Sequence, residues 1–575
     1  MQPHLAMGVS KMTQLRTRPR NQGSHRPLQN TATGLVATVC AFATVGMMLT
    51  ADFAKAQSGK LVAPLAVDWK FTGNPYGKNP ASPIVSEGYV YFASGSYVYA
   101  VSSETGSLKW RYPDSGSPLT SLISVSPTIS GNTLYLGAGD GLYAVDAVTG
   151  KRKWVYNLTR GTGVSTTPVV VGDNLYFISG SRIIALNSQS GEPAGGVWGS
   201  GASAGISAGG EPVTDVVVGD RYLIYGTSDV LHSIDSVTGT QRWSFRSTGI
   251  DANSMPAISG ESLNMIVGTQ LVSRRLASGA IKWSANLPEA SAVPVTVDAD
   301  GTSYVITEGR QIYAINSLKK AIWTRSPQLD FLPLASPVAV DGLLIVPTAL
   351  GGLYAFDTAT GKVKWNYRIA PSSTDSKKIP ANPSVGGRAV SDRGSLFILS
   401  DDGTLTAFNH NATDTLPPVI SIYEPEQGDY ITGKAPFFIT AKVTDEGSGV
   451  DVSTMQLKLD TQIIPMRPRG LEEGKTLDFE YRPEEGTIRF ASREVEGTSS
   501  SLRTGHHTAT ITVKDWLGNL ATKTWSFYTD DTIPRKARKA AAAAPNGRPG
   551  GFPGGTPSGS PSGPNGFGKG GAGGG

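Results

Sequence analysis

The sequence predicts an all-β protein with two folded regions, an eight-bladed β-propeller over residues 61–411 and a β-sandwich over residues 419–531. Three observations lead to this prediction. Of the 575 residues, 69 are Gly and 37 are Pro while 17% are charged, a composition typical of many short strands and turns. Tryptophan recurs at a near-constant spacing through the first two thirds of the chain, and the composition changes at the paired prolines 417 and 418.

The tryptophan repeat defines the first region. Most repeats read as an alternating strand, a tight turn and a second strand that carries the tryptophan, as in LYAVDAVTGKRKW and LYAFDTATGKVKW. Four short strands per repeat of about 40 residues, repeated radially, are typical of propeller blades. The eight tryptophans are 40 to 45 residues apart: Trp69, Trp110, Trp154, Trp198, Trp243, Trp283, Trp323 and Trp365.

Three other positions recur with the tryptophan, and each has a physical reason. A small residue on the third strand leaves room for a neighbouring side chain, a glycine supplies the positive φ of a tight hairpin, and a proline at the start of a strand gives up no ladder hydrogen bond. The small residues are Ala100, Ala144, Ala185, Ser233, Ser273, Ala314, Ala355 and Ala407. The glycines are Gly106, Gly150, Gly191, Gly239, Gly279 and Gly361. The prolines are Pro83, Pro127, Pro168, Pro212, Pro256, Pro294, Pro337 and Pro383. We therefore expect each tryptophan to fill the space between neighbouring sheets.

The two ends of the repeat region predict how the ring closes. The chain enters with VDWKF around Trp69, a fourth strand without a preceding hairpin, and leaves with GTLTAFN at 403–409, a third strand without a tryptophan after it. Pairing these two strands completes an eighth blade and removes two exposed sheet edges.

At this point the repeat can be compared with a known family. The pattern YAxDxxTGxxxW is similar to the repeat of the pyrroloquinoline-quinone-like (PQQ-like) propeller superfamily. That resemblance covers quinoprotein alcohol dehydrogenases and also cofactor-free envelope proteins, among them the lipoprotein of the outer-membrane β-barrel assembly machinery, so it specifies a fold and not an activity. For a dehydrogenase it implies a vicinal disulfide, a calcium ion held by Glu, Asn and Asp, and an aspartate base on long insertions. The single cysteine, Cys40, and the short blades do not match those features.

The region after the paired prolines predicts an antiparallel sandwich. About seven short alternating segments follow within some 115 residues, and two strings, VTDEGSGVDVSTMQLKLD and GHHTATITVKDWLGNLATKTWSF, are similar to bacterial immunoglobulin-like domains. Residues 412–418 are the predicted linker. The clearest expected strands are 437–443, 454–460, 476–481, 487–492, 507–515 and 521–530.

Both ends of the chain are expected to lie outside the fold. Residues 1–56 combine a basic stretch, an apolar run of about 16 residues and the small residues Ala54 and Ala56, which favours a cleaved secretory signal, with an uncleaved anchor as the alternative. Cys40 follows Val39, which disfavours lipidation. Residues 532–575 form a basic Pro/Gly/Ala-rich tail that we expect to be disordered, and whose charges are either solvated or in contact with an anionic polymer.

The charge balance disfavours nucleic acid as a partner. The whole chain has a formal charge of +5, but residues 1–56 carry six basic side chains against one acid, and residues 532–575 carry six against none. The region between them therefore has a formal charge of −6. Phosphate neutralisation needs clustered Lys and Arg on the folded surface, and here the excess lies at the ends of the chain.

Few residues are candidates for chemistry. His232 stands where sister repeats have tyrosine, which favours packing over catalysis, and the adjacent His506 and His507 point to opposite faces of a strand. The acids Asp445, Glu446 and Asp451, and Asp515 with Asn519, are either oxygen ligands for calcium or residues that form tight turns. The prediction is no metal, no cofactor and no catalytic residue. The run at 199–212 lacks the pattern of a phosphate loop and is read as a connecting loop.

The sequence therefore predicts an exported, noncatalytic binding or scaffold protein of the bacterial periplasm, cell surface or extracellular space. The expected chain is monomeric, without a transmembrane segment after signal cleavage, and with an envelope protein or polysaccharide as its partner. Loops on the two faces of a propeller and the outer edges of its blades suit such binding. The alternatives are a ligand- or carbohydrate-handling enzyme, or a quinoprotein-like protein, with its site at the channel mouth, and an adhesin built on the sandwich and tail.

Overall fold

The computed structural model describes the residues of the two folded regions with several gaps. The described ranges are 59–74, 81–114, 119, 121–123, 125–158, 162–199, 204–370, 383–467, 477–483, 485–492, 494–495, 498–499 and 501–534. The predicted signal at 1–56, and all of the predicted tail except 532–534, lie outside them. Apart from short 3₁₀ turns, the regular elements of the described residues are all β-strands, which confirms the predicted all-β class.

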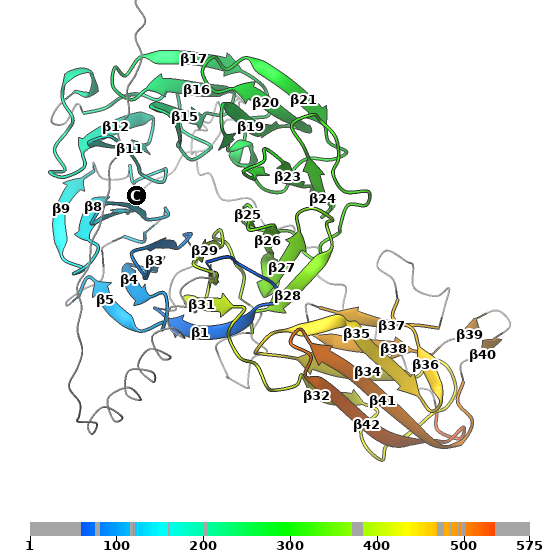
Figure 1. Cartoon of the computed structure of the whole chain (residues 1–575). Helices are drawn as coiled ribbons and strands as arrows, with labels where there is room; N and C mark the ends of the chain where they lie inside the picture. The colour runs from blue at the N-terminus through cyan, green and yellow to red at the C-terminus, as the bar shows by residue number, and fades with distance from the viewer. Residues whose placement is uncertain are drawn as a thin grey trace, which may run out of the picture. The chain divides into compact units, whose positions relative to one another are not determined.

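The first region contains eight antiparallel sheets among the described residues, seven of four strands and one of three. They stand side by side around a common centre (Figure 1). In sheet order from the innermost strand outward, the strands fall into four sets.
The first strands are β2 (Ile84–Ser86), β6 (Thr128–Ser130), β10 (Val169–Val171), β14 (Val217–Gly219), β18 (Ala257–Ser259), β22 (Thr296–Val297), β25 (Val338–Val340) and β29 (Val390–Asp392).
The second strands are β3 (Tyr89–Ser94), β7 (Thr133–Gly137), β11 (Asn174–Ser179), β15 (Tyr222–Gly226), β19 (Ser262–Val267), β23 (Ser303–Ile306), β26 (Leu343–Pro347) and β30 (Ser395–Leu399).
The third strands are β4 (Tyr97–Ser102), β8 (Gly141–Asp146), β12 (Arg182–Asn187), β16 (Val230–Asp235), β20 (Gln270–Arg275), β24 (Ile312–Ile315), β27 (Gly352–Asp357) and β31 (Thr404–Asn409).
The fourth strands are β5 (Leu108–Tyr112), β9 (Arg152–Asn157), β13 (Ile206–Ser207), β17 (Gln241–Arg246), β21 (Ile281–Asn286), β28 (Val363–Arg368) and β1 (Ala66–Thr72).

Burial explains the sequence of the central strands. The second and third strands of each sheet are packed by a neighbouring sheet on both faces, so they read as nearly continuous apolar runs such as YVYFAS and YVYAVS. Separate apolar clusters fill the spaces between neighbouring sheets, as between the β2–β5 and β6–β9 sheets. The fourth strands alternate exposed residues with buried or half-buried ones, because their outer face meets solvent.

The predicted closure of the ring is present. Strand β1 pairs antiparallel with β31, and Trp69 lies opposite Ala407 in that ladder. The sheet β1–β31–β30–β29 therefore joins the first strand of the region to its last three.

Two repeats depart from the predicted strand pattern. Trp198 lies in the 3₁₀ turn η1 (Gly196–Trp198), because it stands seven positions after the turn glycine Gly191, where the tryptophan of a regular repeat stands four positions after its glycine. The turn before Trp323 is one residue shorter than in the regular repeats. Pro327, which follows Trp323, has no N–H to donate to a strand ladder. The sheet β22–β24 therefore has three strands. Two further 3₁₀ turns are η3 (Ala252–Ser254) and η4 (Ala349–Gly351).

The prolines also vary in their distance from the strands. Five of the eight stand directly before a first strand: Pro83, Pro127, Pro168, Pro256 and Pro337. Pro294 stands two residues before β22, and Pro212 and Pro383 stand five and seven residues before β14 and β29.

The described part of the second region contains two sheets packed face to face and a short two-stranded sheet of β39 with β40. The strands in order are β32 (Val419–Glu424), β33 (Tyr430–Ile431), β34 (Phe438–Thr444), β35 (Val450–Leu459), β36 (Gln462–Ile464), β37 (Phe479–Arg482), β38 (Thr487–Ala491), β39 (Glu494–Val495), β40 (Thr498–Ser499), β41 (Gly505–Asp515) and β42 (Leu520–Thr529). One sheet has the order β32–β34–β38–β37, the other β33–β42–β41–β35–β36. Their inner faces share one apolar core that includes Ile439, Phe490, Leu457 and Phe527. The relation to immunoglobulin-like domains stays a prediction.

Candidate functional site

A repeated tryptophan contact joins neighbouring propeller sheets. In the regular repeats the tryptophan lies directly opposite the small residue of its own third strand, as Trp110 does opposite Ala100. Its ring lies against the turn glycine of the next sheet, so that a Cβ on Gly150 would come within 2.7 Å of the Trp110 ring. The six predicted turn glycines have φ between 66° and 74°. Five of these glycines therefore serve both the turn and the close approach of an indole, while Gly239 faces Val197 and Ile206.

The indole N–H of these tryptophans closes the contact. It donates a hydrogen bond to a backbone carbonyl in a turn of the next sheet. In six repeats the acceptor occupies the same place in that turn, the one that Ala147 holds directly after Asp146. The pairs are Trp69 to Ser103 (3.2 Å), Trp110 to Ala147 (2.9 Å), Trp154 to Ser188 (3.2 Å), Trp198 to Ser236 (3.0 Å), Trp243 to Leu276 (3.0 Å) and Trp323 to Thr358 (2.9 Å).

Trp365 makes the same contact with the sandwich instead of the next blade. Its indole N–H donates to the backbone oxygen of Ser448 at 2.8 Å, and its side chain is fully buried. The acceptor lies in residues 445–449, the loop between β34 and β35, which we call the docking loop. Gly449 has φ +89°, and a Cβ there would lie 2.6 Å from the oxygen of Asn366. Asp445 stands four residues before Gly449, the same spacing as Asp146 and Gly150 in a regular turn.

The docking loop also contacts the closure of the ring. Gly447 accepts a hydrogen bond from the backbone N–H of Val67 on β1 at 3.0 Å. The Tyr367 hydroxyl on β28 donates to the Glu446 oxygen at 3.0 Å, and burial raises the pKa of Tyr367. Trp516, in the sandwich turn after β41, packs against the propeller core around Trp365. The loop thus binds the entering strand β1 and the outer strand β28 at once.

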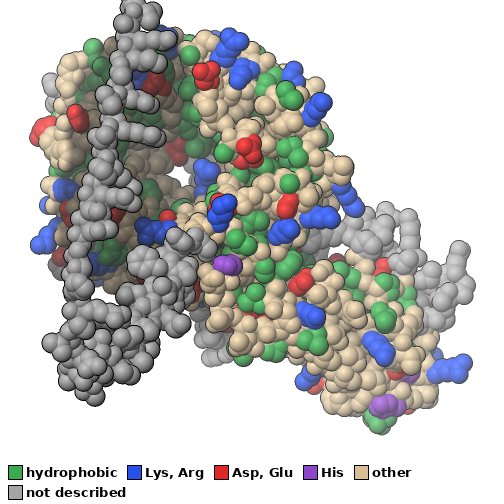
Figure 2. All heavy atoms as spheres, in the orientation of Figure 1, with side chains coloured by type: hydrophobic (Ala, Val, Ile, Leu, Met, Phe, Trp, Pro, Cys, Tyr) green, Lys and Arg blue, Asp and Glu red, His purple; other side chains and the backbone are tan. Residues whose placement is uncertain are grey.

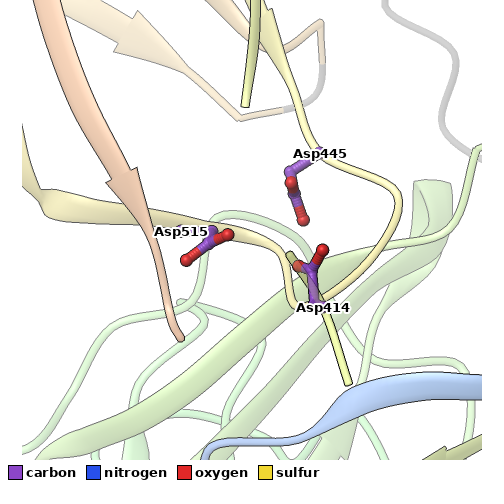
Figure 3. A group of neighbouring side chains, drawn as sticks. All are labelled: Asp414, Asp445 and Asp515. Atoms are coloured by element: carbon purple, nitrogen blue, oxygen red, sulfur yellow. The ribbon is translucent and has the colours of Figure 1, made fainter. Parts of the chain in front are cut away.

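Three aspartates meet beside the docking loop. Asp414 comes from the predicted linker, Asp445 from the docking loop and Asp515 from the end of β41, and oxygen atoms of all three lie within 4.8 Å of one another. Figure 3 shows the three carboxylates pointing toward one another. Asp414 accepts a hydrogen bond from the N–H of Ser448 at 2.7 Å, and Asp445 accepts one from the N–H of Gly449 at 2.6 Å.

The crowding of carboxylates changes the protonation of Asp445. Burial, together with the charges of Asp414 and Asp515, raises its pKa to about 6, against the lowering effect of backbone N–H groups of Gly449 and Gly447. Of the acids that the sequence singled out, Asp445 and Asp515 belong to this cluster. Asp451 instead accepts a hydrogen bond from the N–H of Ser453, which is turn formation, and Asn519 donates to Asp515.

The central channel holds an isolated cation. A cavity of about 250 Å³ is lined by the starts of several inner strands and by Arg388, which stands two residues before β29. Arg388 is the one charged residue among those that line it. The side chain is open to water, yet enough protein surrounds it that desolvation lowers its pKa. In Figure 2 the ring has an opening at its centre with Lys or Arg side chains at the edge.

The segments next to the three-stranded sheet carry exposed apolar side chains, among them the most exposed large apolar side chain of the described propeller residues, Leu318. In place of a fourth strand, residues 321–328 make only isolated bridges to the edge of β24, at Ile315 with Ala321 and at Gln311 with Gln328. Leu318 is 72% exposed and Leu334 is 53% exposed. An irregular outer edge with exposed apolar residues is a feature that protein partners use.

The histidines take structural positions. His232 stacks on Tyr225 with ring centroids 5.1 Å apart, and burial lowers its pKa. His507 is buried and its Nδ1 lies 2.8 Å from Asp460, while His506 contacts the ring of Tyr528 on the other face of β41. Thr227 Oγ1 lies 3.3 Å from His232 Nε2.

Sequence reasoning missed the roles of Asp414, of the docking loop and of Arg388. Asp414 was assigned to the linker and the docking loop to a turn, although the Asp-to-Gly spacing of the loop matches that of the blade turns. No pattern in the sequence points to Arg388, because the sheets that surround it are distant in the chain.

Comparison with known proteins agrees with the repeat. A family model described as outer membrane protein assembly factor BamB matches residues 53–244 and 229–427. The chain belongs to this family. The predicted PQQ-like repeat is thereby confirmed, and the BamB-family repeat supports a propeller that binds protein partners. No curated protein matches the chain.

Solved structures similar to the chain include BamB and alcohol and methanol dehydrogenases. BamB from Moraxella catarrhalis is 18% identical with a TM-score of 0.48, over 61% of this chain and 99% of that one. A quinohemoprotein alcohol dehydrogenase from Pseudomonas putida HK5 is 14% identical with a TM-score of 0.47, over 66% and 80%. A europium-containing methanol dehydrogenase is 14% identical with a TM-score of 0.45, over 62% and 85%. Within the described ranges, no helix has the length and apolar character needed to span a bilayer.

Proposed function

We propose that the protein is an exported, noncatalytic scaffold of the bacterial cell envelope or surface, with the propeller as its platform for a protein partner. The observation that carries this proposal is the family match over residues 53–427, whose description names an outer membrane protein assembly factor. Assembly factors act by holding partners, and a propeller supplies a rigid body whose loops and blade edges are free to bind.

The contacts of the sandwich support a scaffold role. Because the docking loop buries Trp365 and bonds to β1, the sandwich is held on the outer rim of the propeller by specific polar contacts. A partner then meets a surface of fixed geometry, which lowers the entropy cost of binding compared with two tethered domains.

Photo-crosslinking in cells of the native host tests the platform. A photoreactive amino acid at Leu334, beside the three-stranded sheet, is expected to give a discrete crosslinked band with an envelope protein. The matched control is Val148, which is also 53% exposed but lies on a regular turn. A second probe at Leu318 extends the test. Equal crosslinking from Leu334 and Val148 would contradict a partner site at this sheet. So would the absence of crosslinking from Leu334, Val148 and Leu318.

Export is tested separately. We propose residues 1–56 as a cleaved signal and residues 61–411, 412–418, 419–531 and 532–575 as propeller, linker, immunoglobulin-like sandwich and tail. Residues 1–60 fused to alkaline phosphatase are expected to give activity, because the enzyme needs the oxidising compartment to form its disulfides. N-terminal sequencing of the mature protein is expected to start at Gln57. An inactive fusion would contradict export.

The absence of catalysis is tested by offering the cofactor of the dehydrogenases. Purified full-length protein is titrated with pyrroloquinoline quinone and Ca²⁺, and absorbance and thermal unfolding are recorded. No saturable change is expected, because the chain lacks the disulfide and the long insertions that such a site uses. A saturable change would contradict the noncatalytic proposal.

A further inference from the structure

The strongest unexplained feature of the propeller is the channel cavity that contains Arg388. Its wall comes from five successive sheets: Val217 lies on β14, Ile258 on β18, Val297 on β22, Ser336 just before β25 and Arg388 just before β29. These segments span more than 170 residues of sequence and meet only because the ring closes. The cavity is therefore a product of the closed fold and not of any single repeat.

The guanidinium of Arg388 has no ionic partner among the described residues. The ion pairs found in those ranges do not include it, and the backbone N–H of Arg388, not its side chain, forms its recorded hydrogen bond, to Ser82 Oγ at 2.9 Å. The side chain is open to water and the rest of the cavity lining is uncharged, so the guanidinium is accessible to an anionic ligand and has no salt bridge within the described ranges.

The lining also specifies the kind of ligand that would complete the pairing. The guanidinium is a planar fork of donors that matches a carboxylate in a bidentate arrangement. A single cation, with no other charge in the lining, is neutralised by one negative charge, whereas a phosphate dianion would leave an excess negative charge in the same cavity. The apolar walls suit a short hydrocarbon group next to the anion. The volume of about 250 Å³ lies just below the usual range of ligand pockets, which limits the ligand to a small group.

We propose that the central channel binds a monocarboxylate attached to a small apolar group, with Arg388 as the residue that holds the carboxylate. The carboxylate comes either from a free small acid or from the C-terminus of a peptide chain. The site is separate from the blade edges of the scaffold proposal, so each of the two proposals stands or fails without the other.

Calorimetric titration of the full-length protein tests the site. The probes are 4-methylpentanoate and its amide, and N-acetyl-leucyl-leucine with a free C-terminus and as the C-terminal amide. We expect saturable binding of at least one acid below about 10 mM, with the corresponding amide at least about tenfold weaker. Tighter binding of the peptide acid than of 4-methylpentanoate assigns the carboxylate to a chain terminus, and the reverse assigns it to a free acid.

Variants connect binding to the residue. Arg388→Gln is expected to weaken acid binding by about tenfold or more, and Arg388→Lys by less, since it keeps the charge and loses the fork. Val297→Asp places a carboxylate in the same cavity and is expected to abolish acid binding while Arg388 is intact. The matched control is Arg246→Gln, whose side chain is 79% exposed on β17 and which should bind as the wild type does. Thermal unfolding verifies that each variant is folded.

Three results would overturn the proposal. The first is the absence of saturable heat with both 4-methylpentanoate and N-acetyl-leucyl-leucine. The second is equal affinity for an acid and its amide. The third is acid binding that is unchanged in both Arg388→Gln and Val297→Asp.

Discussion

Two kinds of tryptophan contact in this molecule share an indole hydrogen bond to a backbone oxygen but have different partners. Trp110 covers a turn of the next blade, 37 residues ahead in the chain, while Trp365 covers the docking loop of the sandwich, 83 residues ahead. The regular contact repeats a local motif along the ring. The contact of Trp365 joins two regions that the sequence separates by a linker.

The difference shows how a propeller can take a second domain into its own packing. After β31 the chain leaves the ring, so no blade turn is available to cover Trp365. The docking loop takes that place with an aspartate, a glycine at positive φ and a backbone acceptor, and it leaves Trp365 the most buried of the blade tryptophans. Domain interfaces within a chain are usually mobile unless they bury apolar surface, and here an indole is buried.

The largest expected effect comes from removing the indole at each kind of contact. Trp365→Ala should destabilise the protein by about 3–5 kcal/mol, since a fully buried large side chain is replaced by a cavity. Trp243→Ala should cost less, because Trp243 is only partly buried. Denaturant unfolding measures both. Limited proteolysis between 409 and 419 should also increase in Trp365→Ala and not in Trp243→Ala. Equal costs and unchanged proteolysis would show that the sandwich contributes nothing to this contact.

The regular contacts could be predicted from sequence, and the irregular one could not. Tryptophan spacing, the small residue opposite and the turn glycine are all repeated, so their period reveals the sheets and the closure of β1 on β31. The sequence did not show that the glycines also make room for an indole of the neighbouring sheet. The strands β32, β33 and β36 were missed, since they are short or follow prolines. The meeting of Asp414, Asp445 and Asp515 depends on how the sandwich docks, which has no period to reveal it.

A methyl group on Gly449 tests the docking loop directly. Gly449→Ala requires positive φ for an L-residue and places Cβ 2.6 Å from the Asn366 oxygen, so we expect a loss of about 2–3 kcal/mol. Gly428→Ala is the matched control, with φ +84° and nothing within 4 Å of the new Cβ, and should cost about 1–2 kcal/mol. Denaturant unfolding compares them. If Gly449→Ala lowers the free energy of unfolding no more than Gly428→Ala does, the docking loop is not closely packed against β28.

The pH dependence of stability tests the aspartate cluster. The folded-state pKa of Asp445 is raised to about 6, above an unfolded value near 3.9, so the folded state binds more protons between these values. Stability should therefore fall as pH rises from about 4 to 7, by on the order of 2 kcal/mol. Asp445→Asn keeps an acceptor for the N–H of Gly449 and removes the charge, so its stability should change less over that range. Thermal unfolding across pH measures both proteins.

The same unfolding series examines the prediction of no metal site. With 5 mM CaCl₂ or MgCl₂ added at pH 7, the melting temperature of the wild type should move no more than that of Asp445→Asn. A rise confined to the wild type and to Ca²⁺ would contradict the prediction and assign an ion to the three carboxylates. A wild type whose stability is flat between pH 4 and 7 would instead show that the carboxylates do not repel one another.

The smallest expected effect separates one hydrogen bond of the docking loop from its counterpart in the ring. Tyr367→Phe removes the donor to the Glu446 oxygen, and Tyr135→Phe removes the donor to the Ser188 oxygen, both at 3.0 Å. Each change should cost about 0.5–1.5 kcal/mol by denaturant unfolding, because each leaves a carbonyl without this partner. The Ser188 oxygen still accepts from the Trp154 indole, whereas no second donor to Glu446 is recorded among the described residues. Tyr367→Phe should therefore lower the free energy of unfolding more than Tyr135→Phe does. The reverse order would mean that solvent reaches the Glu446 oxygen, and hence that the docking loop is less tightly closed than a blade turn.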